Sequence, residues 1–195
     1  MFRSIALADE IIQTVVNIVR RGDAAQLRTL DAFPAALYAL DAEGFISYFN
    51  PVCIDFAGRR PTVGRDRWCV TWKLYTDEGE FLPHDQCPMA VAIQTGQAIR
   101  GITAVAERPD GTRVNFLPFP TPVIGDHGEV LGAVNMLIDI SGFHQTLLRE
   151  LYGDLQTWQG MLVEQSLATF TADEIRKLIR EIERESRRRP PRILH

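Results

Sequence analysis

The 195-residue sequence lacks the features that mark several classes of protein. Three cysteines are too few for a disulfide scaffold, and no run of about 18 apolar residues is present that could span a membrane. Asp9 and Glu10 interrupt any apolar segment near the N-terminus, so we expect no signal peptide. An odd number of cysteines without an export signal predicts reduced thiols and a cytoplasmic protein.

Catalytic and metal-binding motifs are also missing. The sequence has no C-x-x-C pair, and Cys53, Cys69 and Cys87 are too widely spaced to indicate a zinc site. It has no glycine-rich phosphate loop, no Ser-His-Asp order and no paired-carboxylate motif. We therefore expect a non-enzymatic protein with buried thiols and no metal site.

The composition is that of an ordinary globular protein, with 46% hydrophobic and 24% charged residues. The net charge of −4 is unevenly distributed. Residues 31–142 carry eight basic and fourteen acidic side chains, a net charge of −6, whereas residues 1–30 and 143–195 are each at +1. An acidic middle argues against a nucleic-acid-binding core, because phosphate contacts need a basic surface.

Local patterns predict short elements along the whole chain. Helices are expected at residues 4–21, 51–57 and 88–95. Residues 143–195 are expected to be entirely helical, with a restart that gives a helix at 172–189. Strands are expected at residues 36–40, 45–49, 102–107, 112–119 and 130–140. The first two strands form a hairpin around Asp41-Ala42-Glu43-Gly44, and Asn50 is expected to cap the helix that follows. Residues 61–87 give a less regular pattern.

These pieces, in this order, resemble a PAS domain over roughly residues 30–142. The similar segments are 40–46 (family pattern D-x-x-G-x-I), 49–58 (a helix of type x-N-x-A ending in Gly), 63–65 (x-G-R), 108–112 (R-x-D-G-x) and 132–141 (G-x-x-x-x-x-x-D-I-T). The resemblance implies an α+β fold: a PAS-like five-stranded antiparallel sheet with short helices on one face, flanked by N- and C-terminal helices. The other sheet face must be covered, and both flanking helices are suitable covers.

The expected organisation has three parts. An N-terminal amphipathic helix occupies residues 1–29, the PAS domain residues 30–142, and a helical extension with a basic tail residues 143–195. The resemblance implies a non-enzymatic sensor or adaptor of bacterial signal transduction, related to two-component pathways, that binds a small ligand or a partner protein. Such a module relays its signal through a helical homodimer.

An apolar ligand pocket is the general PAS option, and a solidly packed dimerisation module is the alternative. The candidate pocket walls are Phe49, Cys53, Phe56, Trp68, Trp72, Met89, Ile93, Phe116 and Met136. A flavin is disfavoured, because the stretch 64–70 lacks the F-L-Q of light-sensing relatives and displaces the cysteine by two residues. Haem is a second hypothesis: oxygen-sensing relatives use an axial histidine before the third strand, and His84 lies at a similar separation.

The C-terminal extension predicts dimerisation. Its apolar residues step by three and four positions, as in a heptad seam: Leu148, Leu151, Leu155, Trp158 and Leu162. Residues 147–154 resemble the start of a histidine-kinase dimerisation helix (L-L-x-E-L-x-H-R), but Gly153 stands at the phosphoacceptor position, and too few residues follow for an ATP-binding domain. The Arg-rich residues 184–192 leave a DNA-associated regulator as a third hypothesis, with nucleic-acid binding not favoured.

Overall fold

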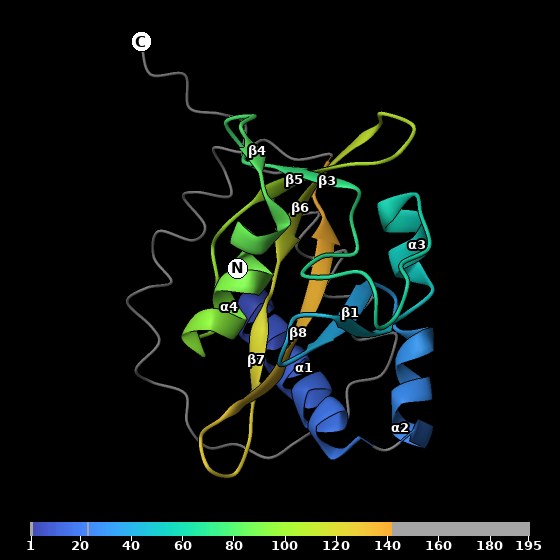
Figure 1. Cartoon of the computed structure of the whole chain (residues 1–195). Coiled ribbons are helices and arrows are strands. Elements are labelled where there is room, and N and C mark those ends of the chain that lie inside the picture. The colour runs from blue at the N-terminus through green and yellow to red at the C-terminus, as the bar shows by residue number, and fades with distance from the viewer. Residues whose placement is uncertain (1, 23, 142–195) are drawn as a thin grey trace.

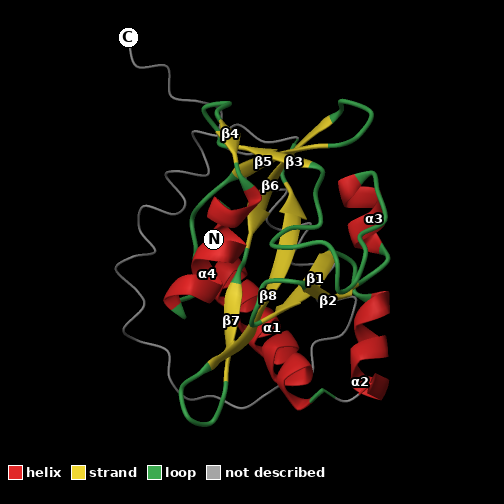
Figure 2. Ribbon diagram, in the orientation of Figure 1, coloured by secondary structure: helices red, strands yellow, loops and turns green. Residues whose placement is uncertain are grey.

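A computed structural model describes residues 2–22 and 24–141. Its helices are α1 (Phe2–Arg21), α2 (Ala24–Thr29), α3 (Val52–Ala57) and α4 (Pro88–Thr95), with short 3-10 turns at Leu30–Ala32 and His84–Gln86. Its strands are β1 (Ala36–Asp41), β2 (Ile46–Phe49), β3 (Lys73–Tyr75), β4 (Phe81–Leu82), β5 (Ala104–Glu107), β6 (Arg113–Pro118), β7 (Thr121–Ile124) and β8 (Val130–Asp139) (Figure 2). No helix in this part of the chain is long and apolar enough to cross a bilayer.

The strands form one antiparallel sheet in the order β2-β1-β8-β6-β5-β3-β4. The long strand β8 lies in the middle, paired with β1 along one edge. Along its other edge it pairs first with β7 and then with β6. The five strands β2, β1, β8, β6 and β5 are the five predicted from the sequence, so the expected α+β sheet is confirmed.

Helix α1 lies across one face of this sheet (Figure 1). Its apolar stripe, including Ile11 and Ile12, is buried against side chains of β1, β7 and β8. These side chains form the α1-side core, which removes apolar surface from water that a bare sheet face would expose. The prediction of a helical cover is therefore met within a single chain by α1.

The opposite face carries α3, α4 and the segment before β3 (Figure 1). Strand residues alternate between the two faces: in β1, Tyr38 and Leu40 belong to this second core, whereas Leu37 and Ala39 belong to the α1-side core. We call it the α3/α4-side core. Two cores on one sheet make β1 and β8 buried on both faces.

Three strands were not predicted. The short β3 and β4 flank the turn at residues 76–80, within the stretch 61–87 whose sequence pattern is less regular. Strand β6 ends before Pro120. The chain then pairs with β8 a second time in strand β7, which contains Pro122. Because β7 pairs on one side only, proline is tolerated there.

The expected cap at Asn50 is wrong. Helix α3 begins after Pro51 without a side-chain cap. The Asn50 side chain is fully buried instead, accepting a hydrogen bond from the Leu37 amide and donating to the carbonyls of Phe33 and Ala35. This amide therefore joins the end of the hairpin to the segment entering the sheet, where its polar atoms are satisfied.

Candidate functional site

Most of the predicted pocket residues lie together on the α3/α4 side of the sheet. Five belong to that core: Cys53, Phe56, Met89, Ile93 and Phe116. The Phe56 and Phe116 rings meet edge to face with centroids 5.4 Å apart. Phe49 and Trp68 pack against the same core from its partly exposed margin. Sequence reasoning thus identified residues from three separate segments that share one interior.

Two predicted pocket residues lie elsewhere. Trp72 is 53% exposed, because the chain leaves the core just before β3 begins. Met136 is buried under α1 in the other core. Since successive strand residues point to opposite faces, Asn135 and Leu137, not Met136, face the predicted pocket.

A buried polar centre lies within the α3/α4-side core. The Tyr38 hydroxyl donates to the Trp68 carbonyl at 3.2 Å and accepts from Nδ2 of Asn135 at 3.2 Å. Asn135 Oδ1 in turn accepts from the Phe119 amide at 2.9 Å. Burial, with the neighbouring Cys69 and Cys87 adding to it, raises the pKa of Tyr38 well above its ordinary value. Tyr38 is therefore a neutral hydrogen-bonding group at physiological pH.

The polar centre continues toward the surface through Cys69, Thr71 and His84. Cys69 Sγ lies 3.8 Å from the Tyr38 hydroxyl and accepts from Thr71 Oγ1 at 3.2 Å. Thr71 Oγ1 also lies 3.4 Å from Nε2 of half-buried His84. Burial and then the charge of Arg59 lower the pKa of His84, which favours the neutral imidazole. Nε2 of His84 therefore already contacts the Thr71 hydroxyl within the protein.

The three thiols are all buried. Burial raises the pKa of Cys53 to about 12, and burial with the adjacent Cys69 raises that of Cys87 to about 12. Cys53 Sγ donates to the Leu37 carbonyl at 3.2 Å. Because the thiolate is the nucleophile and metal ligand, Cys53 and Cys87 are unreactive near neutral pH. Among the described residues, no cluster of three or more His, Cys, Asp or Glu side chains is arranged to hold a metal ion.

A half-open apolar hollow of about 360 Å³ lies outside this core. Its walls come from the β3–β4 turn, from the start of α4 and from the segment before β5, and include Leu82, Pro88, Val91, Ile99 and Ile102. None of the predicted pocket residues lines it.

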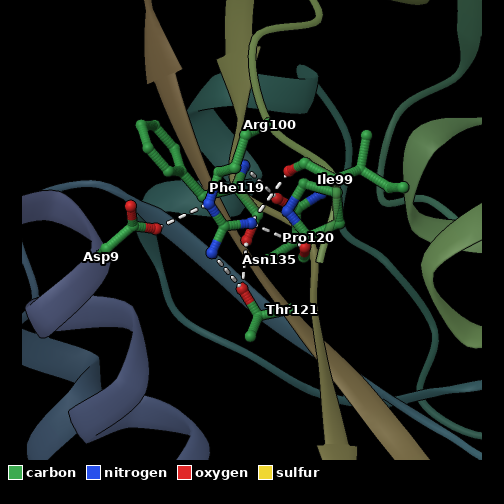
Figure 3. A network of polar contacts seen from close by, with 7 residues as sticks. All are labelled: Asp9, Ile99, Arg100, Phe119, Pro120, Thr121 and Asn135. Atoms are coloured by element: carbon green, nitrogen blue, oxygen red, sulfur yellow. Dashed lines mark hydrogen bonds and ion pairs between the residues drawn. The ribbon is translucent and has the colours of Figure 1, made fainter. Parts of the chain in front are cut away.

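Arg100 forms a second polar centre, on the α1 side (Figure 3). Its guanidinium donates to Asp9 of α1 at 2.6 Å, to the carbonyls of Ile99 and Pro120 at 2.9 Å each, and to Thr121 Oγ1 at 2.8 Å. It also lies 5.6 Å from the centre of the Phe119 ring. One side chain thus joins the N-terminal helix, the segment before β5 and the start of β7.

Sequence reasoning missed Arg100, and it missed the polar roles of Tyr38 and Asn135. Arg100 meets Asp9 across 91 sequence positions, and Asn135 meets Tyr38 across 97. No local pattern connects residues so far apart. The signal that was available is the polar Asn135 within the most apolar predicted strand, since a buried amide needs a partner.

The chain has distant structural neighbours among known proteins. No family model and no curated protein matches the sequence. Among solved structures, the PAS domain of the fruit-fly ELK potassium channel is 16% identical, with a TM-score of 0.44 over 55% of this chain and 87% of that one. A light-oxygen-voltage (LOV) domain is 13% identical, with a TM-score of 0.49 over 69% and 96%. The LOV domain of a blue-light activated histidine kinase from Erythrobacter litoralis is 18% identical, with a TM-score of 0.43 over 56% and 98%.

The described residues have a PAS fold. The antiparallel order β2-β1-β8-β6-β5 and the short helices on one face define it. With identities below 20% and TM-scores below 0.5, we take no ligand, activity or partner from the similar structures.

Proposed function

We propose that the protein is a non-enzymatic sensor or adaptor of a cytoplasmic signalling pathway. Its PAS-fold core would bind a small ligand or a partner protein, and residues 143–195 would relay the response as a homodimer. The observation that carries this proposal is the position of β8. This strand is buried between both cores and leads directly into residues 142–195.

The packing of β8 supports a relay. Ala133 and Leu137 contact the α3/α4-side core, whereas Val134, Met136 and Ile138 contact the α1-side core. Close-packed interiors transmit strain, so a change on one face alters the packing of the other through the shared strand. At the end of β8, Ser141 Oγ accepts from the Asn115 amide at 3.1 Å, which ties the exit to β6.

The α1 cover removes one sheet face as the contact of the proposed dimer. Because α1 already buries one sheet face within the chain, that face needs no second copy. The predicted heptad seam lies outside the described residues, as do the basic tail and the resemblance to a kinase dimerisation helix. It remains the proposed dimer contact, through Leu148, Leu151, Leu155, Trp158 and Leu162.

The two alternative hypotheses are less well supported. A haem-binding gas sensor needs an axial nitrogen on His84, and the contact between its Nε2 and Thr71 argues against that role. A purified protein without a Soret band would exclude it. A DNA-associated regulator depends on residues 184–192, and salt-dependent duplex binding that is lost on truncation at Ser186 would support it.

Sedimentation of the full chain over a wide concentration range tests the proposed function. We expect a dimer for the natural chain and a monomer for Leu155→Asp, because a charge in an apolar seam is not tolerated. Gln156→Asp, one position outside the seam, is the matched control and should remain dimeric. A natural chain that is monomeric throughout contradicts the dimer relay. Mass spectrometry of small molecules released from the purified protein tests whether the core binds a small ligand.

A further inference from the structure

Basic side chains gather in one short loop of an otherwise acidic domain. Four of the eight basic residues in 31–142 lie within residues 59–67, where the only acid is Asp66. The loop therefore has a net charge of +3, while the rest of that region has four basic and thirteen acidic residues. The excess of positive charge is confined to this loop, because the hairpin that it packs against carries the acids Asp41 and Glu43.

The loop is held rigidly against the β1–β2 hairpin. The Gly64 amide donates to the Ile46 carbonyl at 2.8 Å, and the Ile46 amide donates to the Asp66 carbonyl at 2.9 Å. The Trp68 amide donates to the Gly44 carbonyl at 2.8 Å. The Asp66 carboxylate is occupied by the Arg59 guanidinium and by the Thr62 amide at 3.0 Å.

The residue that ends the loop has a strained backbone. Among the described residues, Trp68 is the one non-glycine with a positive φ, at 67°. In this conformation its carbonyl accepts from the Tyr38 hydroxyl at 3.2 Å and lies 3.8 Å from Cys87 Sγ, while its ring stays at the margin of the core. Such backbone strain persists only where the surroundings fix it, so the loop has a defined shape.

Two exposed arginines of the loop, Arg60 and Arg67, are held in place by aromatic rings before any partner binds. The Arg67 guanidinium stacks 4.6 Å from the Phe45 ring centre and 5.0 Å from that of Trp68, and it also donates to the Glu43 carbonyl. Arg60 lies 5.6 Å from the Phe49 ring centre. Stacking on aromatic faces limits the rotamers of a guanidinium while its outer donors stay in water.

Arg65 and Val63 are two further exposed side chains of this loop. The exposed Arg65 side chain has no polar or ring partner among the described residues. Val63 is 54% exposed at the tip of the same loop. We call Arg60, Val63, Arg65 and Arg67 the arginine ledge.

We propose that the arginine ledge binds a carboxylate-rich segment of a partner protein. Guanidinium groups hold carboxylates with paired hydrogen bonds, and the exposed Val63 in the same loop offers a contact for an apolar side chain of the partner. A short peptide can meet the loop alone. A nucleic acid would extend over the acidic remainder of the domain, which repels its phosphates.

Binding of a short fluorescein-labelled peptide of aspartate and glutamate with a central leucine tests the ledge. We expect fluorescence anisotropy to show binding that weakens with added salt. Arg65→Gln and Arg60→Gln should each weaken it by about two- to fivefold, as for exposed ion pairs, and the double variant by about tenfold. Arg28→Gln, at an exposed site on α2, is the matched control and should leave binding unchanged.

Three outcomes would overturn this inference. The double variant could bind the peptide as well as the natural chain does. A single-stranded oligonucleotide of equal charge could bind more tightly than the peptide and lose binding in the same variant, which would indicate nucleic acid. The ledge variants could abolish self-association in sedimentation instead, which would indicate a second copy. The inference extends the proposed function by naming a partner class, and peptide binding is measured separately from dimerisation, so either can fail alone.

Discussion

At the scale of single residues, Gly44 and Trp68 are closely matched. Gly44 has a φ of +85°, which disfavours any side chain. A Cβ atom there would lie 2.4 Å from the Trp68 ring. Gly44, which the sequence indicated as a turn residue, thus also leaves the space that the Trp68 ring occupies. This contact fixes the path of the loop that ends at Trp68.

Substitution of Gly44 by alanine should therefore destabilise the protein in two ways. The left-handed backbone costs about 1–2 kcal/mol for a residue with a Cβ, and the clash with Trp68 adds about 1–3 kcal/mol. Gly79→Ala is the matched control, because Gly79 has a φ of +88° and open space around it. In urea unfolding we expect Gly44→Ala to lose clearly more stability than Gly79→Ala. Equal losses would mean that the Trp68 contact contributes nothing.

At the scale of elements, α1 is held by a broad apolar stripe and by one arginine. Arg100 is mostly buried, with 14% of its side chain exposed, whereas Asp9 is 44% exposed. An exposed ion pair contributes little, so most of the effect of Arg100 comes from the carbonyls and hydroxyl that it joins.

Arg100→Gln should loosen α1 and the start of β7 together. Hydrogen bonds from a charged donor contribute about 1.5–3 kcal/mol, so we expect a loss of about 2 kcal/mol. Asp9→Asn, which removes only the ion pair, should cost about 0.5 kcal/mol. Hydrogen–deuterium exchange of the full chain measures both. Faster exchange confined to α1 in both variants would instead assign the effect to the ion pair.

The elements also show how far the sequence could predict the structure. The hairpin, α1 and α4 have local signals, namely a glycine turn, an apolar stripe and a proline start, and all three are present. Strands β3, β4 and β7 are only two to four residues long, too short for an alternating pattern to be recognised in the sequence. Met136 was assigned to the wrong face of β8, because a shift of one residue along a strand moves a side chain to the other face of the sheet.

At the scale of the whole molecule, burial of ionisable groups without opposite charges decides the response to alkaline pH. Cys53 and Cys87 have an ordinary pKa of 9.0 that burial raises to about 12. The unfolded chain therefore loses these protons first, and the folded state binds more protons above pH 9. Stability contributed by the neutral thiols is present below pH 9 and is lost as the pH rises toward 12.

The free energy of unfolding should accordingly fall above pH 9. Each thiol contributes a slope of up to about 1.4 kcal/mol per pH unit, and Tyr38 adds to it above its own ordinary value of 10.0. Urea unfolding at several pH values measures the slope, and Cys53→Ala should make it shallower even if it lowers stability at neutral pH. An unchanged slope in that variant would contradict the assignment to Cys53.

The position of Trp68 has a consequence for observing the molecule. The chain has three tryptophans, and Trp72 is 53% exposed while Trp68 lies between a guanidinium and a glycine. Iodide in solution reaches the exposed Trp72 indole more readily than the partly buried Trp68, so iodide quenches Trp72 more strongly than Trp68. A carboxylate bound to the stacked Arg67 adds a negative charge near the Trp68 ring and so changes the electric field there. The protein therefore carries its own optical reporter of ledge occupancy, without any attached label.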